Sequence, residues 1–153
     1  MGNDRKGIQT YCFALVVVRL GHRFLLVHER KHGQLWYLPA GRLEWGESFL
    51  EAARRETLEE SGVPIILDGI LGVEHSPHPS GTARMRVIFI AHPANDTPPR
   101  PDPNEHSLEA GWFSVEEMRS LPLRSPDLSL LFARMDQGMA IYPFSLLRDE
   151  SRF

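Results

Sequence analysis

Residues 41–63 read GRLEWGESFLEAARRETLEESGV, and they contain a complete helix signal. Ser48 is followed three residues later by Glu51, the spacing of a capping box, in which each side chain bonds the other's backbone N–H. Gly62 favours a helix end, because glycine adopts the left-handed conformation that closes many helices. The sequence therefore predicts a helix over residues 48–61.

Three carboxylates crowd the last turns of this predicted helix. Glu56 precedes Glu59 by three residues and Glu60 by four, so all three project from one patch. Such like-charge pairs destabilise a helix by ~0.2–0.5 kcal/mol each, and the helix dipole disfavours negative charge at this end. One interpretation is an ordinary solvated helix in which Arg55 pairs with Glu51 and Glu59. The crowding favours a cation site instead, since hard carboxylate oxygens bind Mg²⁺ or Mn²⁺.

The order of residues here resembles the signature of the Nudix hydrolases over its full length. The matching positions are, in order, Gly41, Glu47, Arg55, Glu56, Glu59, Glu60, Gly62 and the aliphatic Val63. Two positions depart from the usual pattern. Thr57 stands where a larger aliphatic residue is common, and Ala40 precedes Gly41 where the family usually has a second glycine.

The resemblance implies a role for each matching residue. The implied metal ligands are the carbonyl of Ala40 and the carboxylates of Glu56, Glu59 and Glu60. Glu47 and Arg55 would pair and hold the helix against its preceding loop. Glu56 would also act as the base, or as the group that orients the attacking water. Mg²⁺ or Mn²⁺ would neutralise the charge that builds up when water attacks a diphosphate.

The rest of the chain predicts an α+β fold. Predicted strands cover residues 11–18, 23–30, 35–41, 65–75, 84–92 and 107–115, and further helices cover 115–121 and 126–138. Because strands and helices do not alternate regularly, we expect a mixed β-sheet sandwiched between helices, the α/β/α arrangement of the Nudix fold. The expected organisation is a flexible tail over 1–9, one Nudix domain over 10–140 and a C-terminal tail over 141–153.

Composition narrows the functional class. The formal net charge of -3 over 153 residues argues against a nucleic-acid polymer as partner. No apolar run reaches the ~18 residues of a membrane span, and the polar N-terminus lacks a signal-peptide core. The single cysteine, Cys12, suits a reducing compartment. We therefore expect a cytoplasmic protein with a small nucleotide as its substrate, and a homodimer stays open.

Three residues outside the metal set are candidates for substrate binding. Arg30 ends the second predicted strand, where it either contacts a phosphate or base or is simply solvated. Trp45 either stacks on a base or covers the loop that carries it. Asp127 either reads the N1–H and 2-amino donors of a guanine or belongs to a helix start of the form Ser-Pro-Asp. A further catalytic glutamate is expected at Glu105 or Glu109.

The substrate stays open among three alternatives. The segments 36–47 and 107–128 resemble the Nudix members that hydrolyse oxidised guanine nucleoside di- or triphosphates, such as 8-oxo-guanine nucleotides. Pro77 and Pro79 leave open ADP-ribose or another dinucleotide-type pyrophosphate. A non-catalytic nucleotide sensor is the alternative of a different class, although such a module would not need the full set of carboxylates.

Overall fold

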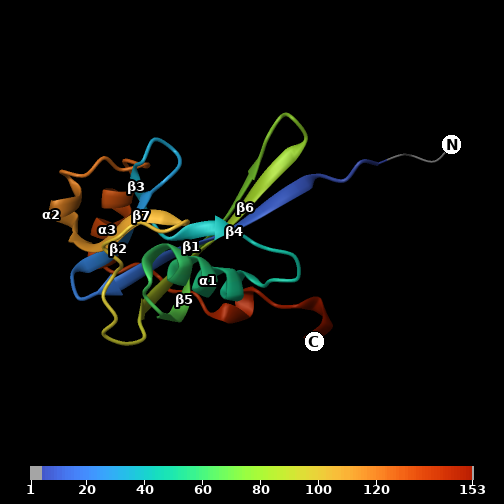
Figure 1. Ribbon diagram of the computed structural model, residues 1–153. Coiled ribbons are helices and arrows are strands. Elements are labelled where there is room, and N and C mark those ends of the chain that lie inside the picture. The colour runs from blue at the N-terminus through green and yellow to red at the C-terminus, as the bar shows by residue number, and fades with distance from the viewer. Residues whose placement is uncertain (1–4, 153) are drawn as a thin grey trace.

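The computed structural model describes residues 5–152, in which seven strands form one sheet (Figure 1). The strands are β1 (Gln9–Leu20), β2 (Arg23–Glu29), β3 (Trp36–Tyr37), β4 (Ala40–Arg42), β5 (Ile65–Pro77), β6 (Thr82–Pro93) and β7 (Ser107–Ser114). The helices are α1 (Phe49–Ser61), α2 (Val115–Met118) and α3 (Leu128–Asp136), with 3₁₀ turns η1 (Phe144–Leu146) and η2 (Glu150–Arg152).

The sheet is mixed, as the sequence predicts. Its main order is β3-β2-β1-β6-β5, with β4 paired to β1 and β7 paired to β2. β1 runs parallel to β6 and antiparallel to both β2 and β4. The long β1 therefore joins the two halves of the sheet and carries β4, which leads directly into α1.

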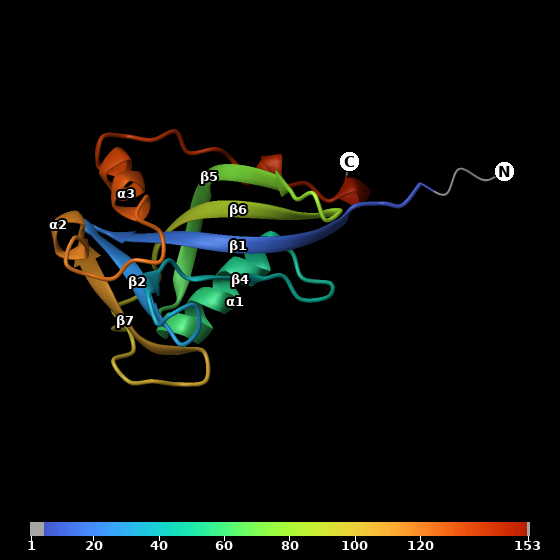
Figure 2. The same cartoon turned by 90° about the horizontal axis from the view of Figure 1, so that it is seen from above.

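Helices cover both faces of the sheet, and the two-residue period of a strand explains how. Along β1, Ala14 and Val16 pack in the cluster that includes Ala52 and Ala53 of α1. The intervening Leu15 and Val17, together with the side chains of Met118 and Phe132, belong to the second cluster, under α2 and α3. Figure 2 shows α1 and α3 on opposite sides of β1 and β6. The predicted α/β/α sandwich is confirmed.

α1 has the boundaries that its capping signals predict. Ser48 Oγ accepts from the backbone N–H of Glu51, and the Glu51 side chain accepts from that of Ser48. Gly62 closes the helix in the left-handed conformation, with φ of 75°. The unusual Thr57 is fully buried, and its hydroxyl donates to the carbonyl of Ala53 at 2.8 Å. A hydroxyl is tolerated there because the helix backbone satisfies it.

Several predicted elements change length. The expected strand over 35–41 is split at Leu38 and Pro39 into β3 and β4, since proline lacks the N–H that a central strand needs. The expected helix over 115–121 ends at Met118. The helix expected over 126–138 begins only at Leu128.

The terminal segments also differ from the expected tails. Residues 5–8 are exposed, β1 already begins at Gln9, and residues 1–4 of the predicted N-terminal tail lie outside the described residues. Part of the predicted C-terminal tail lies against β5, where Tyr142 exchanges backbone hydrogen bonds with Ile70. Phe144 and Leu147 then pack against the α1-side core. No helix among residues 5–152 is long and apolar enough to cross a membrane.

Candidate active site

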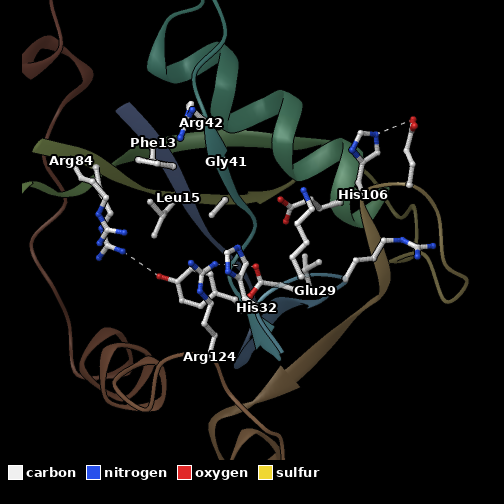
Figure 3. A pocket seen from close by; sticks show the side chains of 17 residues that line it. Phe13, Leu15, Glu29, His32, Gly41, Arg42, Arg84, His106 and Arg124 are labelled. Carbon is white, nitrogen blue, oxygen red and sulfur yellow. Dashed lines mark hydrogen bonds and ion pairs between the residues drawn. The ribbon is translucent and has the colours of Figure 1, made fainter. Parts of the chain in front are cut away.

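A cavity of about 550 Å³ opens beside the C-terminal end of α1 (Figure 3). Its lining is rich in cations, which are Arg30, Lys31, Arg42, Arg84, Arg86 and Arg124. Three carboxylates, Glu29, Glu60 and Glu105, line it as well. A cavity of this composition suits a polyanionic ligand whose charge is shared between cationic side chains and a bound cation.

The glycine that opens the signature lets α1 approach the cavity wall. A Cβ built on Gly41 would lie 1.9 Å from Cδ of Glu56 and 2.0 Å from its Oε1. Any side chain at position 41 would therefore displace this carboxylate. Gly41 lines the cavity with Ala40, so the missing side chain places Glu56 directly behind the wall.

Arg55 connects the loop before α1 to the carboxylates near the helix end. Its Nε and Nη2 donate to the two oxygens of Glu47 at 2.7 and 3.0 Å, which confirms the expected pair. Its Nη1 donates to Glu56 at 2.8 Å and to Glu59 at 3.1 Å. The hydrogen bonds from Arg55 hold the pKa of Glu47 below its ordinary value. One guanidinium thus fixes three carboxylates relative to one another.

The carboxyls of Glu56 and Glu60 have the opposite electrostatic environment. Burial raises the pKa of Glu56, although its contact with Arg55 opposes this effect. Burial and the neighbouring charge of Glu56 raise the pKa of Glu60 well above its ordinary value, although the backbone N–H of Ala40 donates to it. Two acids that disfavour each other's ionisation lie where a cation would stabilise both.

Glu29 is a site residue that the sequence reasoning missed. It ends β2 and lines the cavity with Glu60. Its Oε2 accepts from Nη1 of Arg124 at 3.0 Å, whereas its Oε1 is buried with no hydrogen-bond partner among residues 5–152. Burial raises the pKa of this carboxyl too. The sequence signal was a carboxylate at the end of a strand with an apolar centre.

The chemistry of these residues fits a hard divalent cation. The donors are carboxylate oxygens, three acids line one cavity, and one buried oxygen of Glu29 lacks a partner within the described chain. As the side chains stand, no three His, Cys, Asp or Glu residues among 5–152 already form a complete metal site. Arg55 occupies oxygens of both Glu56 and Glu59. Binding would therefore require small side-chain rearrangements.

The three predicted substrate-binding residues have separate surroundings. Arg30 lines the cavity, and its Nε donates to the backbone carbonyl of Asn104. Trp45 is fully exposed, so the interpretation that it covers its own loop is wrong. The indole points to solvent instead. Asp127 lies instead in a second cavity of about 450 Å³.

The second cavity adjoins the first, because Leu15, Tyr37 and Arg86 line both. Its lining is more apolar and comes largely from the start of α3 and the sheet beneath it. Asp127 takes the N-cap position of α3, but its side chain makes no capping hydrogen bond. The N-cap is therefore the aspartate of the expected Ser-Pro-Asp start, residues 125–127, and not its serine. An exposed carboxylate beside an apolar hollow is compatible with reading a base.

The expected further glutamate corresponds better to Glu105 than to Glu109. Glu105 lines the cavity and lies 3.3 Å from Nε2 of His106. Glu109 lies on β7, where it pairs with His28. The other nitrogen of His106, Nδ1, is 3.8 Å from Oε2 of Glu59, so this loop reaches the carboxylates of α1.

Comparisons with known proteins agree with this geometry. Residues 10–133 match the NUDIX domain family. The 8-oxo-dGDP phosphatase NUDT18 of Homo sapiens is 33% identical over 122 residues, which cover 76% of this chain and 36% of that protein. The corresponding phosphatase of Danio rerio is 37% identical over 131 residues, or 80% of this chain and 37% of that protein. The chain thus spans about a third of the length of these relatives.

Other matches extend over nearly the whole chain. The phosphatase NudJ of Escherichia coli O1:K1 is 32% identical over 135 residues, which cover 87% of each protein. A NUDIX hydrolase from Nitrosomonas europaea has a similar structure, with a TM-score of 0.76 and 27% identity, and the match covers 95% of this chain and all of that one.

Proposed function

The chain belongs to the NUDIX domain family, and from this premise we propose that it is a divalent-metal-dependent hydrolase. It cleaves a phosphate anhydride bond in a nucleoside diphosphate derivative. The observation that carries this proposal is the cavity that Glu29 and Glu60 line together with six arginine and lysine side chains, in which Oε1 of Glu29 is buried without a partner among residues 5–152. Acids that share a cavity with many cationic side chains suit a metal ion and a phosphate group bound together.

The residues of the chain have distinct parts in this reaction. Cationic side chains on the cavity wall, Arg30, Lys31 and Arg84 among them, bind the phosphate oxygens. Glu56 orients the attacking water and accepts its proton. Arg55 and Glu47 hold the loop that carries Ala40 and Gly41 in register with α1. When bound by Glu56, Glu59, Glu60 and the Ala40 carbonyl, Mg²⁺ or Mn²⁺ supplies charge neutralisation at the phosphate.

We propose an oxidised guanine nucleoside diphosphate as the substrate. The 8-oxo-dGDP phosphatases are among the relatives named above. The second cavity adds a physical reason, since its apolar lining suits a base and Asp127 can accept from the two donors on the guanine edge. The shared wall at Tyr37 would let one nucleotide extend from the carboxylates to this hollow.

The test is a hydrolysis assay with purified protein, Mg²⁺ and a panel of 8-oxo-dGDP, dGDP, 8-oxo-dGTP and ADP-ribose. Phosphorus NMR would identify which anhydride bond is cleaved. We expect 8-oxo-dGDP to be cleaved fastest, with release of phosphate, and no turnover after chelation with EDTA. Full activity in EDTA would exclude the metal assignment, and faster cleavage of ADP-ribose would exclude the proposed substrate.

A further inference from the structure

The loop that precedes β7 grips the end of α1 that carries the carboxylates. This loop, residues 94–106, contains Arg100 between Pro99 and Pro101. Because each proline ring fixes its own φ and restricts the preceding residue, the backbone around Arg100 has little freedom. A side chain mounted on such a backbone can act as a fixed support.

Every carbonyl that α1 leaves open at its C-terminus has a donor. The last four carbonyls of a helix have no partner within the helix. The first of them, on Leu58, accepts from the N–H of Gly62 at 2.9 Å. Arg100 serves the other three. Its backbone N–H donates to Ser61 at 2.8 Å, and its Nη2 donates to the carbonyls of Glu60 at 2.8 Å and Glu59 at 3.3 Å.

Two neighbours of Arg100 reinforce this contact. Asn104 Nδ2 donates to the carbonyl of Glu59 at 3.2 Å, and Ser107 Oγ donates to the carbonyl of Glu60 at 2.6 Å. Nη2 of Arg100 also donates to Ser107 Oγ at 2.7 Å, and Ser107 is fully buried. The carbonyls of Glu59 and Glu60 therefore each have two donors.

Charge supports the same arrangement. The last turn of α1 contains no basic residue, and Arg55, the cation that pairs with Glu56 and Glu59, lies further from the helix end. A cation near a helix C-terminus is favourable. The half-buried guanidinium of Arg100 supplies this cation from outside the helix, on the backbone side of the carboxylates.

We propose that Arg100 is a positioning residue for the metal site, a role that rests on the proposed function. It acts through the backbone of Glu59 and Glu60, whose carboxylates would contact the cation. Holding these carbonyls fixes the direction in which the two side chains leave the helix. The same loop continues to Glu105 and His106 at the cavity, so Arg100 also sets the distance between that wall and α1.

The test measures metal binding rather than turnover. Arg100→Met keeps the aliphatic stem and the backbone N–H that donates to Ser61, but it removes the side-chain donors to Glu59 and Glu60. Mn²⁺ binding to the full chain without nucleotide is followed by electron paramagnetic resonance. We expect affinity to fall about 10- to 100-fold, as for partners that orient metal ligands. Arg100→Lys should restore part of the loss, because an ammonium can still donate to one of the carbonyls.

The matched control is Arg23→Met. Arg23 also makes a two-oxygen contact, with Glu117 of α2, and not with α1. We expect its Mn²⁺ affinity to equal that of the wild type. A purely structural role for Arg100 would lower the melting temperature of Arg100→Met and leave the Mn²⁺ affinity of the folded protein unchanged, which would overturn the proposal.

A second variant keeps the proposal testable if Arg100→Met does not fold. Ser107→Ala deletes one donor to the Glu60 carbonyl and should also weaken Mn²⁺ binding, but by a smaller factor. An unchanged Mn²⁺ affinity in Ser107→Ala would overturn the proposal. If the wild type binds Mn²⁺, the variants weaken binding and no nucleotide is hydrolysed, the proposed function fails while the positioning role stands. If the wild type binds no Mn²⁺, both fail.

Discussion

The two ends of α1 are built in opposite ways. At the N-terminal end, Ser48 and Glu51 satisfy each other's backbone groups within four residues of chain. At the C-terminal end, Glu56, Glu59 and Glu60 repel one another, and the open carbonyls depend on a loop some forty residues later, at Arg100 and Asn104. The capping at the N-terminal end stabilises the helix, whereas the clustered carboxylates at the C-terminal end destabilise it.

This difference teaches where function lies on the helix. An acid near the N-terminus is stabilised by the helix dipole, whereas acids near the C-terminus are not. An arrangement that raises the pKa of Glu60 by burial and by a neighbouring charge lowers the stability of the protein without metal. A bound cation would remove this cost, because it stabilises the ionised carboxylates.

The largest expected effect is on turnover when the C-terminal end loses its base. Glu56→Gln removes a proton acceptor, whose contribution alone is ~10²–10⁴-fold, and it also removes a metal ligand. We expect kcat to fall by at least that factor while circular dichroism shows a folded protein. Glu51→Gln at the other end is the control and should leave kcat near that of the wild type. Equal losses in both variants would show that Glu56 acts on stability alone.

The next effect concerns the residue that joins α1 to its preceding loop. Arg55→Ala removes the bonds to Glu47, Glu56 and Glu59, so the loop with Ala40 can shift. Displacements of about 1 Å at a positioning site cost ~10²-fold in rate. Steady-state kinetics should show this loss, whereas the exposed neighbouring variant Arg54→Ala should not. A normal rate for Arg55→Ala would remove its positioning role.

A smaller effect is expected at the start of α3, which differs from the start of α1. Asp127 holds the N-cap position but makes no capping bond, unlike Ser48. If it reads a base instead, Asp127→Asn should lower kcat/KM on a guanine nucleotide by ~10-fold, the size of a two-point base contact, with little change in melting temperature. An equal loss on pyrimidine nucleotides, or a lower melting temperature with unchanged selectivity, would leave Asp127 as a helix-start residue.

The smallest effects are on the free energy of unfolding without metal. Substitutions at the two ends of α1 should change it in opposite directions. Ser48→Ala should destabilise the protein by about 1 kcal/mol, because it removes the N-cap. Glu60→Gln should raise the free energy of unfolding slightly, by a few tenths of a kcal/mol per relieved like-charge pair. Urea unfolding in EDTA measures both.

The pH dependence of Glu60→Gln follows from the raised pKa of Glu60. The pKa of Glu60 is near 4.5 in the unfolded chain and higher in the folded protein. The contribution of such an acid to stability is fully present below the unfolded pKa and is lost as the pH rises through the folded pKa. The advantage of the variant over the wild type should therefore grow from pH 4.5 to neutral pH. A variant that is less stable than the wild type at every pH would show that Glu60 is structural.

The sequence by itself determined the parts that depend on short chain separation. The capping box at Ser48 and the end at Gly62 follow from residues a few positions apart, whereas the pair of Glu47 with Arg55 was expected from the resemblance to the Nudix signature. A helix repeats the same geometry wherever it occurs, so its spacing alone places side chains on one face. The β-branched and aromatic residues of 11–18 likewise predicted a strand, and residues 14–18 of β1 are buried.

Only the tertiary structure decided which distant residues meet at α1. Glu29, Arg100 and Arg124 come from three separate loops or strand ends, and nothing in their local sequence relates them to Glu60. Their positions depend on strand order and register, which determine which strand ends face each other.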